Sequence, residues 1–163
     1  MQAGCHSAQC QASGAVVPAM DPVGNFMFAG NPVKAGADAL MPGDTALLQP
    51  YGGPGGGHHV PAQSAFEGAP GYDANAAPAI PNSELARRGL NHLMVITPAQ
   101  RAGYMAFAKT GSPLTWEAVA KIETQALVKA GMNQSMAQNT VQQAIQQLRS
   151  MGVAQPTRIP WGR

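Results

Sequence analysis

At 163 residues, the chain is long enough for one domain of ordinary size with a short appendage. Hydrophobic residues make up 45% of it and charged residues only 11%, and no stretch reaches the ~18 apolar residues of a membrane span. We therefore expect no transmembrane helix. No secretory signal is visible, so we expect any export to follow a route independent of a signal peptide.

The charges divide unevenly along the chain. Up to Asn82 there are one basic and five acidic side chains, whereas from Ser83 onward there are nine basic and three acidic ones. The basic second part suits a phosphate-binding surface, although ordinary solvated helix faces explain the same excess. The only cysteines of the chain, Cys5 and Cys10, fit no strong zinc signature.

The first 50 residues show only a weak pattern of secondary structure. We expect them to form a loop-rich segment or a linker from a longer protein. Within them we expect a strand over 23–28, a turn over 41–44 and a strand over 45–48 that leads into a glycine-rich stretch. The following residues, 55–81, predict mostly loop.

Short strands are expected inside this loop region around Val60 and over 79–80. From residue 82 onward the sequence pattern changes from loop-like to helical. Ser83 is the expected N-cap of a helix over 84–95, which Gly89 interrupts.

Three further helices are predicted after this one. Thr97 is the expected cap of a helix that runs to Lys109, with proline at its first position. Thr115 is the expected cap of the third helix and Gly131 its end. The fourth helix begins at Asn133 or Ser135 and is expected to stop at Gly152. In the irregular tail that follows, Trp161 either packs back on the domain or stacks on a nucleic-acid base.

The most informative segment is Gly57-His58-His59, at the end of the glycine-rich stretch. Neutral imidazole is the commonest metal-binding side chain, and histidine also titrates near neutral pH. Successive side chains of a strand point to opposite faces, so the two rings are expected to do different work. With His92 on a helix, His58 can bind a divalent cation while His59 activates water as a general base.

Other side chains complete this hypothetical phosphodiesterase site. An asparagine or a backbone carbonyl can orient His59 through its second ring nitrogen. Arg87, Arg88 and Arg101 lie close in sequence and can hold phosphates. A histidine pair in an exposed loop and a satisfied helical histidine remain the alternative interpretation of the same residues.

The segment Gly57-His58-His59-Val60-Pro61, followed by His92 and by 97–101, resembles the GHH branch of the HNH/endonuclease VII superfamily. The resemblance covers roughly residues 50–163 and includes the ending 156–160. These nuclease domains occur at the C-termini of bacterial polymorphic toxins, including type VI secretion effectors. The resemblance implies metal-dependent DNA cleavage, delivery into the cytoplasm of a competitor cell and a cognate immunity protein.

For the site, the resemblance implies His59 as general base, His58 and His92 as metal ligands, and Asn82 or Asn91 as the residue that orients the base. The sequence departs from the wider pattern, because the gap from His59 to any helical asparagine is long and no second histidine follows His92 one turn later. We therefore expect water, phosphate or a carboxylate to complete the coordination, with Glu67 and Asp73 as the candidate carboxylates. The expected cation is Mg²⁺, with Mn²⁺, Zn²⁺ and Ni²⁺ as alternatives and no small-molecule cofactor.

Together these expectations describe an α+β protein. A small ββα-metal core of the HNH or treble-clef type is combined with a loop-rich N-terminal half and a C-terminal bundle of three to four helices. Residues 1–50 form the linker segment and residues 51–163 the nuclease toxin domain. The competing hypothesis is a non-enzymatic structural or interaction module of a virion or secretion apparatus. An RNase is a third option, whereas a deaminase lacks its zinc signature in this chain.

Overall fold

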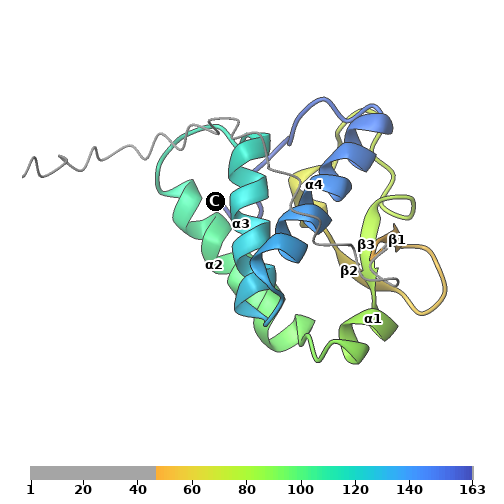
Figure 1. Ribbon diagram of the computed structural model, residues 1–163. Coiled ribbons are helices and arrows are strands. Elements are labelled where there is room, and N and C mark those ends of the chain that lie inside the picture. Colours follow the sequence, from red (N-terminus) through yellow and green to blue (C-terminus); the bar gives the residue numbers. More distant parts are fainter. Residues whose placement is uncertain (1–46, 163) are drawn as a thin grey trace, which may run out of the picture. The chain divides into compact units, whose positions relative to one another are not determined.

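The computed structural model describes residues 47–162. In this part of the chain, four α-helices and a three-stranded antiparallel sheet form a mixed α+β fold (Figure 1). The predicted α+β class is therefore confirmed. The strand expected over 23–28, the turn over 41–44 and the two cysteines lie outside the described residues.

The sheet is small, and its middle strand is the last in sequence. Its strands are β1 (Gln49–Pro50), β2 (Gly57–His59) and β3 (Pro78–Pro81), in the order β1-β3-β2. The strand predicted over 79–80 is confirmed by β3. Of the strand predicted over 45–48, residues 47 and 48 precede β1, which begins at Gln49, and residues 45 and 46 lie outside the described residues.

Leu47 and Leu48 are nonetheless part of the folded region, because both are buried in the same core cluster as Ile80. The fold thus includes residues on both sides of the predicted boundary at position 50. The nature of residues 1–46 as a linker stays a prediction.

Glycine is required where β2 meets β3. A Cβ placed on Gly57 would lie 2.5 Å from the carbonyl oxygen of Ile80, which is closer than real Cβ contacts. Only glycine lets the backbone approach β3 this closely. The close pairing puts His58 opposite Ile80 and His59 opposite Ala79.

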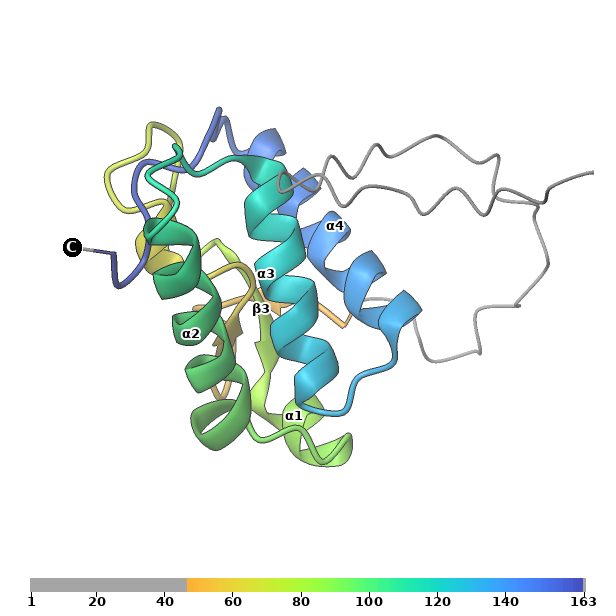
Figure 2. The ribbon, with the colours of Figure 1, turned by 90° about the vertical axis from the view of Figure 1, so that its left-hand side faces the viewer.

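One helical segment lies between β2 and β3, and the others follow β3. They are η1 (Gln63–Ala65), α1 (Asn82–Arg87), the π-helical turn η2 (His92–Ile96), α2 (Thr97–Ala108), α3 (Trp116–Lys129) and α4 (Gln134–Ser150). Helices α2 and α3 lie side by side in front of β3 in Figure 2, and α3 also lies beside α4 in Figure 1. α4 contacts β3 as well, so the helices cover one side of the sheet.

The helix predicted over 84–95 is confirmed only in part: residues 84–87 lie in α1 and 92–95 in η2, and the chain between them is not helical. Gly89 adopts a left-handed conformation with a φ of 66°. The amide of Gly89 donates to the carbonyl of Ala86, and that of Leu90 donates to Leu85. This is the Schellman arrangement, in which a glycine ends a helix rather than interrupting it.

The starts of α1 and α2 also differ from the prediction. α1 begins at Asn82, so Ser83 lies inside the helix instead of capping it. Thr97 makes no capping hydrogen bond, because the chain is already helical at Ile96 and η2 runs directly into α2. α2 ends at Ala108, one residue before the predicted Lys109.

The ends of α3 and α4 are confirmed. The side chain of Thr115 accepts a hydrogen bond from the amide of Ala118, and that of Asn133 accepts one from Met136. Such bonds satisfy amides that a helix start leaves free. Gly131 and Gly152 both take positive φ values just after the helices, as predicted.

The core has two neighbouring clusters. One joins the sheet to α3 and α4 and includes Val60, Ile80, Leu127 and Val141. The other surrounds Phe66 and Tyr104 under η1. Helices of the described residues 47–162 are all too short or too polar to cross a bilayer.

Candidate active site

The site begins at the end of β2. His58 lies on the inner face of this strand and is only 7% exposed. Its Nε2 atom is buried and has no hydrogen-bond partner among the described residues. An unpaired buried nitrogen is unfavourable unless a ligand or water satisfies it, so this atom is a candidate for contact with a ligand.

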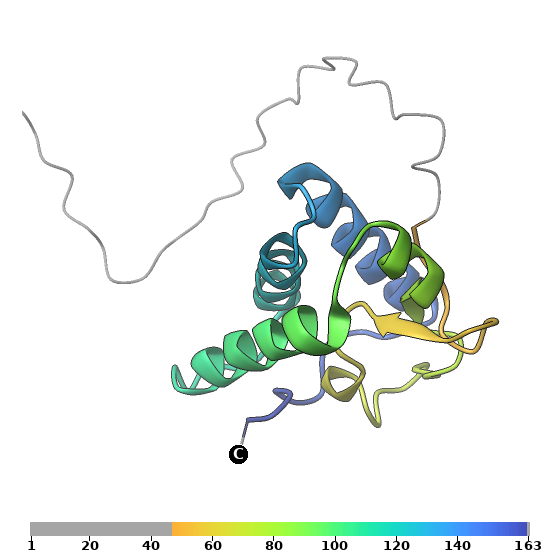
Figure 3. The same ribbon diagram turned by 90° about the horizontal axis from the view of Figure 1, so that it is seen from below.

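His92 lies next to His58 although the two are 34 positions apart in the sequence. It is the first residue of η2, and in Figure 3 the β2 arrow lies next to the segment that leads into α2. The two ring centroids are 5.6 Å apart, with the ring planes at 80°. Nδ1 of His92 is also buried without a partner in the described part of the chain.

This spacing fits a shared cation. Two imidazoles that bind one ion tetrahedrally through nitrogens about 2.1 Å away have ring centroids roughly 5 Å apart. The observed 5.6 Å is close to this value. His58 and His92 therefore suit a divalent cation, with the correction that His92 belongs to η2 and not to one continuous helix over 84–95.

His59 follows on the same strand, and its ring stacks on Tyr51. The ring centroids are 3.9 Å apart and the planes differ by 18°. Neither ring nitrogen of His59 has a hydrogen-bond partner within residues 47–162. Both nitrogens are also buried, so stacking fixes the plane of the ring, and substrate or water would have to reach these nitrogens through the surrounding pocket.

All three histidines line one pocket of about 320 Å³. The rest of the lining comes from the glycine-rich turn, η1, the start of α2 and the C-terminal tail, with polar groups from Gln63, Ser64, Glu67, Thr97 and Gln100. A pocket of this volume lies at the small end of ligand sites and suits a phosphate-sized group.

Burial controls the charge of the two neighbouring rings. It lowers the pKa of His58 from 6.5 to about 3, with further lowering by His92 and His59. Burial also lowers the pKa of His59 to about 4. Both imidazoles are therefore neutral at pH 7, which is the form that binds a cation or accepts a proton.

The two asparagines predicted to orient His59 do not contact it. Nδ2 of Asn82 donates to the carbonyl of Gly55 at 2.7 Å and so fastens the glycine-rich turn to the start of α1. Oδ1 of Asn91 accepts from the amide of Met94 and caps η2. Both side chains hold backbone in place, so the structure replaces the predicted amide with the ring of Tyr51 as the group that positions His59.

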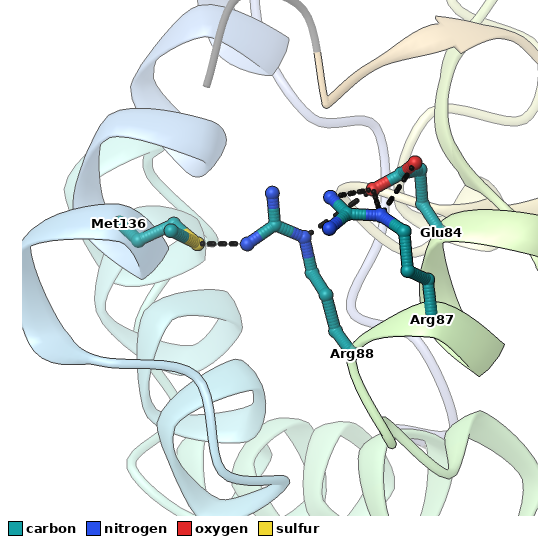
Figure 4. Close-up of polar contacts among 4 residues, drawn as sticks. All are labelled: Glu84, Arg87, Arg88 and Met136. Atoms are coloured by element: carbon teal, nitrogen blue, oxygen red, sulfur yellow. Dashed lines mark hydrogen bonds and ion pairs between the residues drawn. The ribbon is translucent and has the colours of Figure 1, made fainter. Parts of the chain in front are cut away.

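Two of the three predicted phosphate-binding arginines lie away from the pocket. Arg87 and Arg88 both contact Glu84, at 2.6 Å and 3.4 Å, and Arg88 also reaches the sulfur of Met136 (Figure 4). Neither arginine lines the histidine pocket. Arg88 thereby connects the end of α1 to α4, whereas the bonds of Arg87 to Glu84 lie within α1 and lower the pKa of Glu84.

Arg101 is closer to the site. It lines a second opening that shares Ser64 and Trp161 with the histidine pocket. Arg101 was predicted to act with Arg87 because the two are close in sequence. It lies on α2, however, and lines a different part of the surface from Arg87. The structure also adds Arg158, which lines the same opening and had not been predicted.

The candidate carboxylates differ in position. Glu67 lines the histidine pocket and pairs with Arg158 at 3.0 Å. Asp73 accepts a hydrogen bond from the amide of Asn75 and does not line the pocket. Within residues 47–162, no group of three histidine, cysteine or acidic side chains is close enough to hold one ion. The pair His58 and His92 would therefore need water or phosphate as further ligands.

A buried carboxylate below the pocket had not been predicted. Glu123 on α3 is fully buried. It accepts hydrogen bonds from the amide of Ala62 at 2.9 Å, from Nε2 of Gln100 at 2.6 Å and from the hydroxyl of Tyr104 at 2.7 Å. Desolvation raises the pKa of Glu123, and these three donors oppose the increase.

Glu123 thereby ties together three segments around the pocket: the chain after β2, α2 and α3. A Cβ on Gly103 would lie 2.7 Å from the side chain of Ile122, so glycine allows α2 and α3 to come this close. A single glutamate in an otherwise helical pattern gives no sequence signal of burial. Its contacts depend on residues up to 61 positions away.

Searches of protein-family models, curated proteins and solved structures found no match to this chain. The chemistry of the site is therefore inferred from its own residues and from the resemblance carried by Gly57-His58-His59.

The low pKa of His58 predicts how stability depends on pH. Its folded pKa of about 3 lies below the unfolded value of 6.5, so its contribution to stability is complete above pH 6.5 and is lost as the pH falls. In metal-free protein with EDTA, each pH unit below 6.5 should cost about 1.4 kcal/mol from this group. Urea unfolding of the wild type and of His58→Asn at pH 7, 6 and 5 measures the effect.

The variant should lose less stability than the wild type over this range. Glu123, whose pKa is raised, favours lower pH and acts in the opposite direction in both proteins. The difference between the two slopes therefore isolates His58. Equal slopes would show that His58 is not held neutral by burial.

Proposed function

We propose that this chain is a metal-dependent endonuclease that hydrolyses DNA phosphodiester bonds. The observation that carries the proposal is the meeting of His58 and His92, with unpaired buried nitrogens, beside His59 in one pocket. Two antiparallel strands, β2 and β3, precede the helical segment that carries His92, which supports a core of the ββα-metal type.

In this proposal His58 and His92 would hold the divalent cation. The bound cation would act as a Lewis acid that stabilises negative charge on the phosphoryl oxygens and on the leaving oxygen. His59 takes a proton from a water molecule through one ring nitrogen. The water oxygen then bonds to phosphorus, the bond to the leaving oxygen breaks, and solvent protonates that oxygen.

The protein positions the reacting groups in two ways. Tyr51 keeps the ring of His59 in one plane by stacking, so the ring does not have to be ordered during the reaction. Glu123 holds Gln100 and the backbone of Ala62 at the pocket wall.

We further propose that the chain is an antibacterial toxin, on the resemblance of its GHH segment to polymorphic toxin nucleases. Delivery by type VI secretion into the cytoplasm of a target cell and neutralisation by an immunity protein belong to this proposal. Expression in a bacterial host without an inhibitor should then be toxic for the wild type and harmless for the His59→Ala variant.

Supercoiled plasmid is the direct test of the metal-dependent reaction. The wild-type protein should nick or linearise it with Mg²⁺ or Mn²⁺ and leave it intact with EDTA. His58→Ala and His92→Ala should each weaken Mn²⁺ binding, measured by calorimetry, by more than about 100-fold and reduce cleavage accordingly. Gln142→Ala, an exposed change on α4, is the control and should behave as wild type.

Cleavage that persists at the same rate in EDTA would contradict the metal-dependent mechanism. Full cleavage by His92→Ala would show that the two rings do not share an ion. No cleavage under any condition, with no toxicity, would leave the non-enzymatic module as the better hypothesis.

A further inference from the structure

A second opening adjoins the histidine pocket. It has a volume of about 670 Å³, and two arginines, Arg101 on α2 and Arg158 in the C-terminal tail, contribute to its wall. Ser64 and Trp161 line both openings. A bound chain can therefore pass from the histidines to the arginines along these two residues.

Trp161 stands at this junction in an unusual conformation. Its φ is 54°, the only positive value outside glycine in residues 47–162. It follows Pro160, and the amide of Gly162 donates to the carbonyl of Ile159 at 3.2 Å, which closes a turn with Trp161 as third residue. Glycine or asparagine is the usual choice there, and a large side chain costs about 1 kcal/mol or more.

Among the described residues, the indole ring has one aromatic neighbour. It lies 6.0 Å from the ring of the buried Tyr104, which is itself held by Glu123, yet Trp161 remains 39% exposed. A flat, anchored and partly exposed ring at a strained position is a feature that folding alone does not require. Such a ring offers a stacking surface for a base.

The two arginines differ in how freely their charge can bind a phosphate. Arg158 donates to the carbonyl of Ser64 at 3.1 Å and pairs with Glu67, so its place is fixed and its charge is partly balanced. Arg101 is exposed, and within the described residues it forms no ion pair. Arg101 is thus the cation best placed to meet a phosphate beside Trp161.

We propose that this second opening binds the nucleotide next to the cleaved phosphodiester, with its base stacked on Trp161 and its phosphate on Arg101. This inference rests on the proposed nuclease function of the histidine pocket. Inside a continuous duplex the neighbouring base pairs cover both faces of each base, whereas a single strand exposes the faces of its bases to an indole ring. The preferred substrate is therefore single-stranded or locally unpaired nucleic acid.

Binding can be measured without cleavage. The His59→Ala protein in EDTA is titrated into a fluorescein-labelled single-stranded DNA oligonucleotide and into the duplex of the same sequence, and anisotropy reports the affinity. The single strand should bind more tightly. Adding Trp161→Ala should weaken its binding about 5- to 100-fold, and Trp161→Phe should weaken it less.

Arg101→Ala, in the same background, should reduce the slope of log affinity against log salt by about 0.7, because one phosphate contact is lost. Lys121→Ala removes the same charge from an exposed position on α3 that lines neither opening, and it should leave the affinity nearly unchanged. The comparison separates a local contact from the general charge of the chain.

The fluorescence of Trp161 distinguishes a lost stacking contact from a misfolded variant, because it reports contact with the oligonucleotide while the Trp161 side chain is still present. In a Trp116→Phe protein, Trp161 is the only tryptophan, and the oligonucleotide should quench its fluorescence. Three results would each overturn the inference. The oligonucleotide could fail to quench the fluorescence, Trp161→Phe and Trp161→Ala could both bind it as tightly as the parent protein, or single strand and duplex could bind equally well. Cleavage by the wild type in that case would leave the nuclease proposal standing, whereas Trp161-dependent binding without any cleavage would remove the nuclease proposal alone.

Discussion

The His59→Ala variant is expected to lose plasmid cleavage by a factor of about 10² to 10⁴, the usual contribution of a general base. Its stability should change little, because the side chain is only half-buried and makes no hydrogen bond within residues 47–162. Initial cleavage rates in Mg²⁺ and thermal unfolding of the two proteins provide the measurement. The exposed Gln142→Ala change on α4 serves as the control.

Two variants of Tyr51 refine this prediction. Tyr51→Phe keeps the aromatic ring that stacks on His59 and should retain most of the rate, whereas Tyr51→Ala should lower kcat more than it raises KM. If the His59→Ala protein cleaves DNA at the wild-type rate, His59 is not the general base. Equal rates for the two Tyr51 variants would remove the positioning role of the ring.

Glu123→Ala should have the largest effect on stability. The change leaves the amide of Ala62, the amide group of Gln100 and the hydroxyl of Tyr104 without their shared acceptor, and it opens a cavity between α2 and α3. Unsatisfied buried groups and cavities together should lower the free energy of unfolding by on the order of 3 kcal/mol or more. Urea unfolding at pH 7 measures the loss.

Glu123→Gln is the matched control. Its carbonyl oxygen can still accept from Ala62 and Tyr104, and a flipped Gln100 amide can accept from the new NH₂ group. We expect this variant to remain close to wild type in both stability and cleavage. If Glu123→Ala is as stable as wild type, the network does not hold the pocket wall.

The sequence determined the parts of the fold that depend on near neighbours. Thr115 and Asn133 bond to amides three residues away, and Gly131 and Gly152 end their helices through bonds to the last turn. These interactions are local, so composition and spacing predict them. Gly89 obeys the same rule, and the prediction failed only because it was interpreted as an interruption.

The same local logic placed His58 and His59 on alternate faces of a short strand. It does not extend to Asn82 and Asn91, to which the resemblance gave the orienting role but which bond instead to the glycine-rich turn and to η2. Nothing in the spacing tells whether an amide side chain bonds to backbone or to an imidazole, because backbone partners are the commoner choice.

Only the tertiary structure decided which side chains meet. The rings of His58 and His92, the stacking of Tyr51 on His59 and the contacts of Glu123 all join residues from separate elements. These contacts follow from how the helices pack on the sheet. Packing depends on the shape of the whole core, and the periodic spacing of apolar residues does not specify which side chains of separate elements meet.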